Sequence, residues 1–370
     1  MDPRVREAMI PFLGEVFGNP SSPHAAGRAA RKAVEEARAQ AACLLGARPE
    51  SIVFTSGGTE SINTAVRGAL AAQPSKRHVV TSETEHSATR KLCAQLLREG
   101  YEVTWLRVNG VGLPCPAEFA AALREDTAIA TVVWANNETG VLFPVEEMAR
   151  TADERGVVFH VDAVQAAGKM PVDLSRVPVH LLSLSAHKFH GPKGVGALFV
   201  REGLGLPPLL IGGGQETGRR GGTENVPGIA GMGAAAVLAR EATASDMPRV
   251  AAMRDSFEAA VRSRFPQARF HGNADRRLPN TSNFALPGLD ARGLLVVLDR
   301  LGVACSPGSA CSSGTPDASH VLRAMGVADD EARSSLRFSF GRMNGPRDAD
   351  DAVAALAEAA RRMAGDALGD

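Results

Sequence analysis

Lys188 lies in a segment whose residue types could perform amine chemistry. Residues 183–200 begin at the end of an apolar stretch, pass through Ser185, His187 and Lys188, and reach a second apolar stretch through several glycines. This order is typical of a strand, a turn that presents an amine, and another strand. Partial burial and nearby cations lower the pKa of a lysine enough for its amine to condense with an aldehyde. Taken alone, Lys188 could also be an ordinary loop lysine.

Polar and ionisable residues follow four successive predicted strands, and these residues make the amine chemistry specific. They are Glu85 and His86 after residues 78–81, Asn136, Asn137 and Glu138 after residues 129–134, Asp162 and Gln165 after residues 157–161, and Ser185, His187 and Lys188 after residues 179–184. Parallel strands bring their carboxyl ends to the same sheet edge, where active groups lie. Burying so many polar groups without a ligand would be costly, so we predict a ligand site there.

The elements that must position these residues alternate regularly along the chain. Predicted strands cover residues 51–55, 78–81, 102–108, 129–134, 157–161 and 179–184, and predicted helices cover residues 24–45, 62–70, 87–98, 116–123 and 145–155. This alternation favours an α/β fold with a mainly parallel sheet and helices on both faces.

A glycine turn connects the first strand to its helix. Ser56, Gly57, Gly58 and Thr59 follow the strand directly. Backbone N–H groups at a helix start face one point and can hold an anion such as a phosphate. The turn is not a Walker loop because no Gly-Lys-Ser/Thr follows. By itself the pattern is weak, and a plain capped helix start is the more frequent explanation.

The composition changes near residues 243–247, where we place a domain boundary. Before it, a glycine-rich loop covers residues 212–222 and precedes Thr223; alone, this loop could be a surface linker. After it we predict helices at 247–264, 290–300, 318–325 and 347–364, and strands at 282–286 and 335–340. We therefore predict a large domain at residues 11–246 and a smaller α+β domain formed by residues 1–10 and 247–370.

The overall composition excludes several classes of function. The 41 basic and 41 acidic residues cancel, so net charge indicates neither a nucleic acid nor an anionic membrane as the main partner. No apolar run approaches the roughly 20 residues of a membrane span, and the first residues lack a signal-peptide core, so we expect a cytoplasmic protein. Five scattered cysteines without a Cys-x-x-Cys pair fit neither a disulfide framework nor a metal site.

Several ordered motifs together resemble one family. They are the residues at 17–22 (FGNPSS), 55–61 (TSGGTES), 84–86 (TEH), 136–138 (NNE), 160–165 (HVDAVQ), 185–188 (SAHK), 220–225 (RGGTEN), 309–311 (SAC) and 337–339 (RFS). From about Pro11 to Arg342 the chain resembles the pyridoxal phosphate (PLP) enzymes of aminotransferase class V, and among them the cysteine desulfurases of the iron–sulfur-cluster type. The resemblance implies an aspartate-aminotransferase-like, fold type I PLP-binding domain with a mainly parallel seven-stranded sheet.

The resemblance also implies a role for each candidate residue. Lys188 resembles the Schiff-base lysine, Asp162 the partner of the pyridinium nitrogen, Gln165 the donor to the phenolic oxygen, and His86 the residue that stacks on the ring and can move protons. Gly58, Thr59, Ser185 and His187 resemble the phosphate-binding residues, with Thr223 supplied by the other subunit of a homodimer. Asn137 and Arg337 resemble the pair that holds the substrate carboxylate, and an Arg fork suits that task.

Cys311 separates this interpretation from a plain aminotransferase. It lies in a stretch of small residues at 306–314, which we expect to swing. A mobile thiolate can attack a bound sulfur and transport it. We interpret Cys43, Cys93 and Cys115 as buried structural cysteines. The sequence is ambiguous for Cys305, six residues before Cys311, and we leave it as structural.

The implied function is conversion of L-cysteine to L-alanine, with a persulfide on Cys311 that passes to a sulfur-acceptor protein such as an iron–sulfur scaffold. Alternatives are a class V aminotransferase, a selenocysteine lyase, or a scaffold protein that keeps the fold without catalysis. Family members usually begin with an Asp/Asn-Asn-Ala-Thr-like segment, whereas this sequence starts at Met1 after that segment. Either the start of the sequence is misassigned or truncated, or the enzyme lacks the contact that this segment makes with the active site. In the second case we expect substrate affinity or turnover to be affected and the cofactor to be retained. The tail after the final helix is short, so a scaffold-docking surface there is not assigned.

Overall fold

The structure is a computed structural model that describes residues 1–308 and 318–366. The chain divides into two compact units. The first contains Met1–Leu106, Pro116–Ala135 and Pro144–Thr243, and the second contains Arg107–Cys115, Asn136–Phe143 and the chain from Ala244 onward. Among the described residues, no helix combines the length and apolarity that crossing a membrane requires.

The first unit is built on a sheet of seven strands within the described part of the chain. In sequence order, the elements are α1 (Pro3–Met9), η1 (Ile10–Leu13), α2 (Ala25–Leu45), η2 (Pro49–Ser51), β1 (Ile52–Thr55), α3 (Gly58–Ala72), β2 (His78–Ser82), α4 (Ser87–Arg98), β3 (Glu102–Leu106), α5 (Pro116–Ala122), β4 (Thr127–Val133), α6 (Val145–Glu154), β5 (Val158–Asp162), β6 (Leu181–Ser185), η3 (Ala186–Phe189), β7 (Gly196–Val200), η4 (Gln215–Gly218) and α7 (Val226–Ser245). The strand order is β1-β7-β6-β5-β4-β2-β3.

The sheet is parallel from β3 to β6, and β7 runs antiparallel to both β6 and β1. Every residue of β2, β4, β5 and β6 is buried, as expected for strands covered on both faces. The predicted mainly parallel seven-stranded sheet is therefore confirmed. The carboxyl ends of β2, β4, β5 and β6 lie at the same edge, so the topology brings the residues after these strands to one side of the unit.

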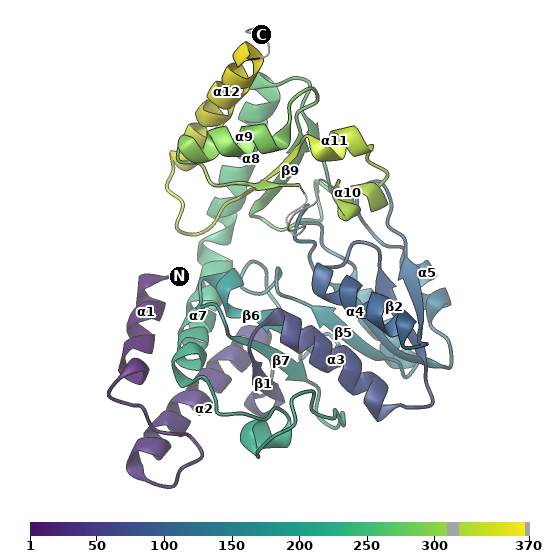
Figure 1. Cartoon of the computed structure of the whole chain (residues 1–370), viewed down its shortest axis with the longest axis vertical. Helices are drawn as coiled ribbons and strands as arrows, with labels where there is room; N and C mark the ends of the chain where they lie inside the picture. The colour runs from purple at the N-terminus through teal and green to yellow at the C-terminus, as the bar shows by residue number, and fades with distance from the viewer. Residues whose placement is uncertain (309–317, 367–370) are drawn as a thin grey trace. The chain divides into compact units, whose positions relative to one another are not determined.

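The segments between the strands form helices because their apolar residues recur at helical spacing. Figure 1 shows α3 and α4 lying across the sheet, and α3 packs on β6 and β7. Helix α2 ends where Gly46 adopts a left-handed conformation, φ +62°, as the sequence predicts. Helices α1, α2 and α7 lie side by side (Figure 1): Gly231 of α7 faces Met9, and Gly233 faces Ala37. The absence of a β-carbon at both glycines permits this close approach.

The second unit has its own core and its own sheet. Its elements are α8 (Met247–Arg264), β8 (Arg269–Phe270), β9 (Thr281–Ala285), α9 (Ala291–Arg300), β10 (Ser306–Pro307), α10 (His320–Ala324), α11 (Asp329–Arg333), β11 (Ser335–Ser339) and α12 (Asp348–Asp366). The described strands pair in the order β10-β11-β9-β8. Helix α12 packs against α8 and α9, and Phe257, Phe284 and Phe338 fill the core with ring contacts.

The predicted domain boundaries need two corrections. Residues 1–10 belong to the first unit, not to the small domain: Val5 is fully buried, and the Asp2 N–H donates to the His190 carbonyl at 3.0 Å. Residues 107–115 and 136–143 belong to the second unit, although we placed both in the large domain. A bridge between Val141 and Arg277 fixes the latter loop there. Pairing at such sequence separation leaves no local signal.

Candidate active site

Lys188 follows the central strand β6 on a single turn of 3-10 helix. Strand β6 lies between β5 and β7, and its Ser183 is in register with Asp162 of β5. The turn ends at His190, whose left-handed conformation, φ +66°, closes it. The Lys188 side chain is exposed, although we expected it to be partly buried. An exposed lysine can be reached by a carbonyl compound, with which an amine of this type condenses.

Asp162 ends β5 at the neighbouring position of the sheet. It is 5% exposed, and one carboxylate oxygen accepts a hydrogen bond from the Val164 N–H at 3.0 Å. Burial raises the pKa of Asp162 above its ordinary value, while the Val164 N–H and the charges of His86 and Lys188 act in the opposite direction. A buried carboxyl group in this state favours a ligand with a cationic N–H, because that group would compensate the desolvated charge.

His86 begins helix α4 and lies close enough to Asp162 to influence its titration. The Ala88 N–H donates to His86 Nδ1 at 3.2 Å, so His86 acts as the N-cap of the helix. Because Nδ1 accepts, the proton of the neutral ring resides on Nε2. The cap therefore fixes both the ring position and the atom that can donate.

A small cradle lies where β1 turns into α3. The helix begins at Gly58 without a side-chain cap, and Gly57 has φ +153°, a conformation that favours glycine. A β-carbon on Gly58 would lie 2.8 Å from Val164 Cγ2, so the cradle has room for a backbone only. The Ser185 hydroxyl lies beside Gly57 and Gly58 and bonds His187 Nδ1 at 2.9 Å.

The neighbours of this cradle are positively charged. Burial lowers the pKa of His187, and the charges of Lys188, Lys193 and Lys169 lower it further. Thr59, the next residue of the helix, is exposed at the same helix end. The uncapped helix start, two side chains with donors and nearby lysines are groups that suit an anion.

Gln165 directly follows Val164, whose N–H donates to the Asp162 carboxylate. Its side-chain oxygen accepts a hydrogen bond from Lys169 Nζ at 2.9 Å, and its backbone carbonyl accepts from the same amine at 2.9 Å. The amide nitrogen of Gln165 is consequently the end that can donate to a ligand.

These residues of the first unit fit PLP. The buried Asp162 suits a cationic ring nitrogen, the helix start at Gly58 suits a phosphate, the Gln165 amide suits a phenolic oxygen, and Lys188 suits an aldehyde. Among the described residues, no cluster of His, Cys, Asp or Glu side chains suits a metal ion.

The two predicted carboxylate-binding residues meet in the second unit. Arg337 of β11 donates to the Asn137 carbonyl at 2.8 Å and to Ser306 Oγ at 3.1 Å. Both Arg337 and Asn137 are half-buried. The guanidinium is thus fixed by two of its nitrogens, while its planar fork is of the type that binds carboxylates.

Two buried carboxyl groups beside predicted site residues had no role in the sequence prediction. Burial raises the pKa of Glu85 to about 8; Ser82 Oγ donates to it at 2.6 Å and the Val133 N–H at 3.0 Å. Burial also raises the pKa of Glu138 to about 7, although the Ser319 hydroxyl, which donates to it, and Arg337 lower it. The sequence signal for Glu85 and Glu138 was their position in the polar stretches that follow two predicted strands.

Thr223, the predicted phosphate ligand from the other subunit, is exposed. In its own chain it lines a cavity of about 160 Å³ together with Ser56 and Gly194. Arg220, three residues earlier, pairs with Glu60 at 2.9 Å, which ties the glycine-rich loop to the first turn of α3.

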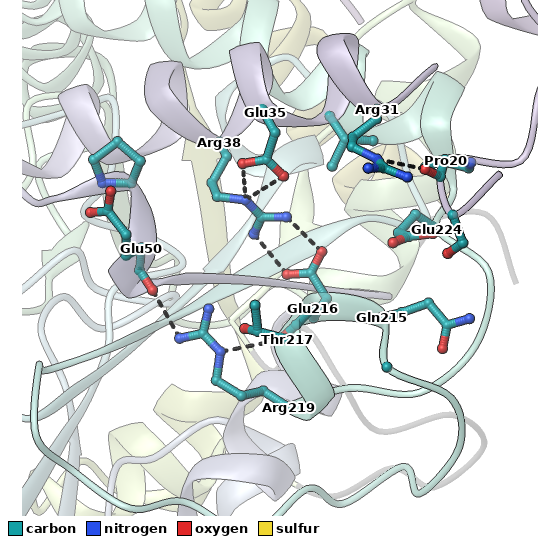
Figure 2. Close-up of a pocket in the computed structure, with 14 residues that line it drawn as sticks. Pro20, Arg31, Glu35, Arg38, Glu50, Gln215, Glu216, Thr217, Arg219 and Glu224 are labelled. Carbon is teal, nitrogen blue, oxygen red and sulfur yellow. Dashed lines mark hydrogen bonds and ion pairs between the residues drawn. The ribbon is translucent and has the colours of Figure 1, made fainter. Parts of the chain in front are cut away.

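A cleft of about 920 Å³ lies at the start of this loop, and its lining contains none of the described candidate residues. Figure 2 shows its floor, where Arg38 of α2 binds Glu216 through two hydrogen bonds of 2.8 Å. The Phe54 N–H also donates to Glu216, at 2.9 Å. Glu216 and Thr217 both have positive φ, +49° and +55°, which is strained for residues with side chains. The sequence pattern did not predict this ion pair because its members are 178 residues apart.

The described cysteines differ in exposure. Cys93 is buried and Cys305 is partly buried, and burial raises the pKa of each thiol to about 12. Both are therefore inert, as expected for structural thiols. Cys43 and Cys115 are exposed, so the prediction that they are buried is wrong. Cys311 lies outside the described residues.

Comparison with known proteins identifies what the chain resembles. The sequence profile "Aminotransferase class-V" matches residues 1–351. A protein named cysteine desulfurase from Trichormus azollae is 46% identical over 363 residues, which are 98% of this chain and 91% of that protein. The cysteine desulfurase NifS of Azotobacter vinelandii is 47% identical over 343 residues, 92% of this chain and 85% of that protein. The solved structure of a NifS-like protein superposes with a TM-score of 0.91 at 35% identity and covers 97% of this chain and 95% of its own.

Proposed function

The chain belongs to the class V aminotransferase family and is a PLP-dependent cysteine desulfurase, and we propose that it converts L-cysteine to L-alanine through a persulfide on Cys311. The predicted resemblance is confirmed. The single observation that supports the assignment best is the placement of Lys188 and Asp162 after two adjacent parallel strands. Asp162 would hold the ring nitrogen of the cofactor, and Lys188 would hold its aldehyde.

PLP supplies an aldehyde and, when its ring nitrogen is protonated, an electron sink for charge at the substrate Cα. Lys188 would hold the aldehyde, and its amine would take the Cα proton of the substrate. Asp162 keeps the ring nitrogen protonated. Gly58, Thr59, Ser185 and His187 hold the phosphate, and the Gln165 amide donates to the phenolic oxygen. His86 would hold the ring, and its Nε2 can donate a proton.

The second unit supplies the substrate-binding pair and the second nucleophile in this proposal. Arg337, oriented by the Asn137 carbonyl, holds the substrate carboxylate together with the Asn137 side chain. The Cys311 thiolate attacks the sulfur of cysteine. An S–S bond forms and the substrate C–S bond breaks, and Cβ takes up a proton. One cysteine and one thiol therefore give one alanine and one persulfide, without an external oxidant.

The persulfide then passes to a sulfur acceptor, for which an iron–sulfur scaffold protein is our proposal. We also propose a homodimer in which Thr223 completes the partner's phosphate site. The exposed position of Thr223 and the anchoring of its loop by Arg220 support this arrangement. The cytoplasmic location remains a prediction.

The test compares alanine and sulfide release from L-cysteine in the presence of a thiol reductant. We expect Cys311→Ala to retain the absorbance of bound PLP and to lose alanine formation. Cys115→Ala, which removes an exposed thiol, is the matched control and should keep activity. Undiminished alanine formation by Cys311→Ala would remove Cys311 from the mechanism. A keto acid as the main product would identify an aminotransferase, and a strong preference for selenocysteine would identify a selenocysteine lyase.

A further inference from the structure

We propose that Lys169 is a positioning residue that fixes the side-chain amide of Gln165 in the orientation that donates to the cofactor. This inference rests on the proposed function. Lys169 has so far entered only as one of the charges near His187 at the anion site. Its amine lies 2.9 Å from Gln165 Oε1 and 2.9 Å from the Gln165 backbone carbonyl.

The chemistry of the two side chains determines which way the amide faces. A lysine ammonium has three donors and no acceptor, so only the carbonyl end of an amide can face it. The NH₂ group of Gln165 must then occupy the opposite position. Without the lysine, the amide could rotate by a half turn and present its oxygen to the phenolic oxygen of the cofactor, and two acceptors would repel each other.

The local fold places Lys169 on the correct side of Gln165. Residues 163–170 form a series of tight turns, in which the Lys169 N–H donates to the Ala166 carbonyl at 3.0 Å. Gly168 has φ +74°, and a β-carbon there would lie 2.9 Å from Phe189 Cβ and 2.8 Å from Ala239 Cβ. Lys169 is four residues after Gln165, and these turns bring its amine to the Gln165 side chain at 2.9 Å.

This turn is also packed against the turn that contains Lys188. Phe189, which contacts Gly168, directly follows Lys188 and is 2% exposed. The charge of Lys169 further affects His187 at the anion site. Lys169 thus contacts Gln165 and lies close enough to His187, a predicted phosphate ligand, to influence its pKa. Gln165 is the residue through which it acts on the cofactor.

The test is a pH titration of the bound-cofactor absorbance in Lys169→Met, Lys169→Arg, Gln165→Ala and the double variant Lys169→Met/Gln165→Ala. A donor to an oxygen stabilises its anion, so a loss of that donor favours the protonated form of the chromophore. We expect Lys169→Met to raise the titration midpoint by about 0.5–1 pH unit. Lys169→Arg, which keeps the donors, should restore most of the wild-type midpoint.

The double variant separates positioning from a purely structural role. We expect its midpoint to equal that of Gln165→Ala, because the effect of Lys169 on the chromophore passes through Gln165. Additive shifts, or a wild-type midpoint in Lys169→Met, would overturn the inference while leaving the proposed function intact. If the wild-type protein bound no PLP, the proposed function itself would fail and this inference with it. Thermal unfolding of each apoprotein checks that the variants fold.

Discussion

Two buried carboxyl groups in the first unit have opposite surroundings. Glu216 on the floor of the cleft in Figure 2 accepts two hydrogen bonds from Arg38 and one from the Phe54 N–H. Asp162 at the end of β5 accepts one from the Val164 N–H, and burial raises its pKa. The two side chains have similar exposure, 6% for Glu216 and 5% for Asp162. Burial alone does not distinguish them.

Glu216 and Asp162 differ in the group that compensates the negative charge of the carboxylate. The guanidinium of Arg38 has a raised pKa: although burial lowers it, the hydrogen bonds and charge of Glu216 outweigh that effect. The protein thus neutralises Glu216 with its own cation and uses the pair to anchor a strained loop. At Asp162 the compensation is expected from the ligand. A buried carboxyl group with an internal cation is structural, and one that a ligand must neutralise is functional.

Substituting Arg38 should have the largest effect on folding. Arg38→Met leaves Glu216 buried without its cation, and we expect a loss of about 3–5 kcal/mol in the free energy of unfolding. Chemical denaturation of the apoprotein measures this loss. The double variant Arg38→Met/Glu216→Gln should recover most of it, because the amide oxygen can still accept from the Phe54 N–H. If the double variant were as unstable as Arg38→Met, packing by Arg38 would be its main contribution.

Asp162→Asn should reduce activity without reducing stability, which is the reverse of the effect expected for Arg38→Met. A neutral amide cannot keep the ring nitrogen protonated, so we expect kcat/KM for alanine formation to fall roughly 10²–10³-fold. The apoprotein should be no less stable than wild type, since desolvation penalises a carboxylate more than an amide. Steady-state kinetics and apoprotein denaturation measure the two quantities. A stability loss similar to that of Arg38→Met would show that Asp162 is structural, contrary to the comparison.

The sequence predicted Asp162 and did not predict the Arg38–Glu216 pair, and the reason is physical. Strand β5 is a run of buried residues that ends at Asp162, so the local pattern marks the site edge. The mainly parallel sheet follows from the same alternation of strands and helices, whereas its seven strands were implied by the family resemblance. Glu216 lies in a glycine-rich loop without periodicity, and its partner belongs to a helix 178 residues away. Pairing at that distance depends on tertiary folding.

The same contrast applies to smaller features. Lys169 is four residues from Gln165, so their sequence distance allowed a contact. The sequence did not predict this contact, because a lysine on a turn is usually solvated. The loop at residues 136–143 was assigned to the wrong unit because its bridge to Arg277 is non-local. Local patterns therefore predicted the strand ends, although helix α3 begins at Gly58, four residues before the predicted start at residue 62. Long-range ion pairs and unit boundaries required the structure.

Glu85 allows a finer test of the region around Asp162, with a smaller expected effect. Burial raises the pKa of Glu85 to about 8, and the negative charge of Asp162 raises it further. The folded apoprotein therefore binds more protons than the unfolded chain between the ordinary glutamate pKa and about pH 8. The contribution of Glu85 to stability is fully present below that ordinary value and is lost as the pH rises through about 8.

Glu85→Gln should remove this part of the pH dependence. The amide oxygen can still accept from Ser82 Oγ and the Val133 N–H, so the fold should persist. We expect the variant to gain stability over wild type as the pH increases from 5 to 8, by at most about 1.4 kcal/mol per pH unit. Denaturation of the apoproteins across this range measures the gain, and Glu118→Gln, at an exposed site on α5, should follow wild type. Parallel stability curves for Glu85→Gln and wild type would mean that Glu85 is compensated as fully as Glu216, and the contrast between the two regions would then be confined to Asp162.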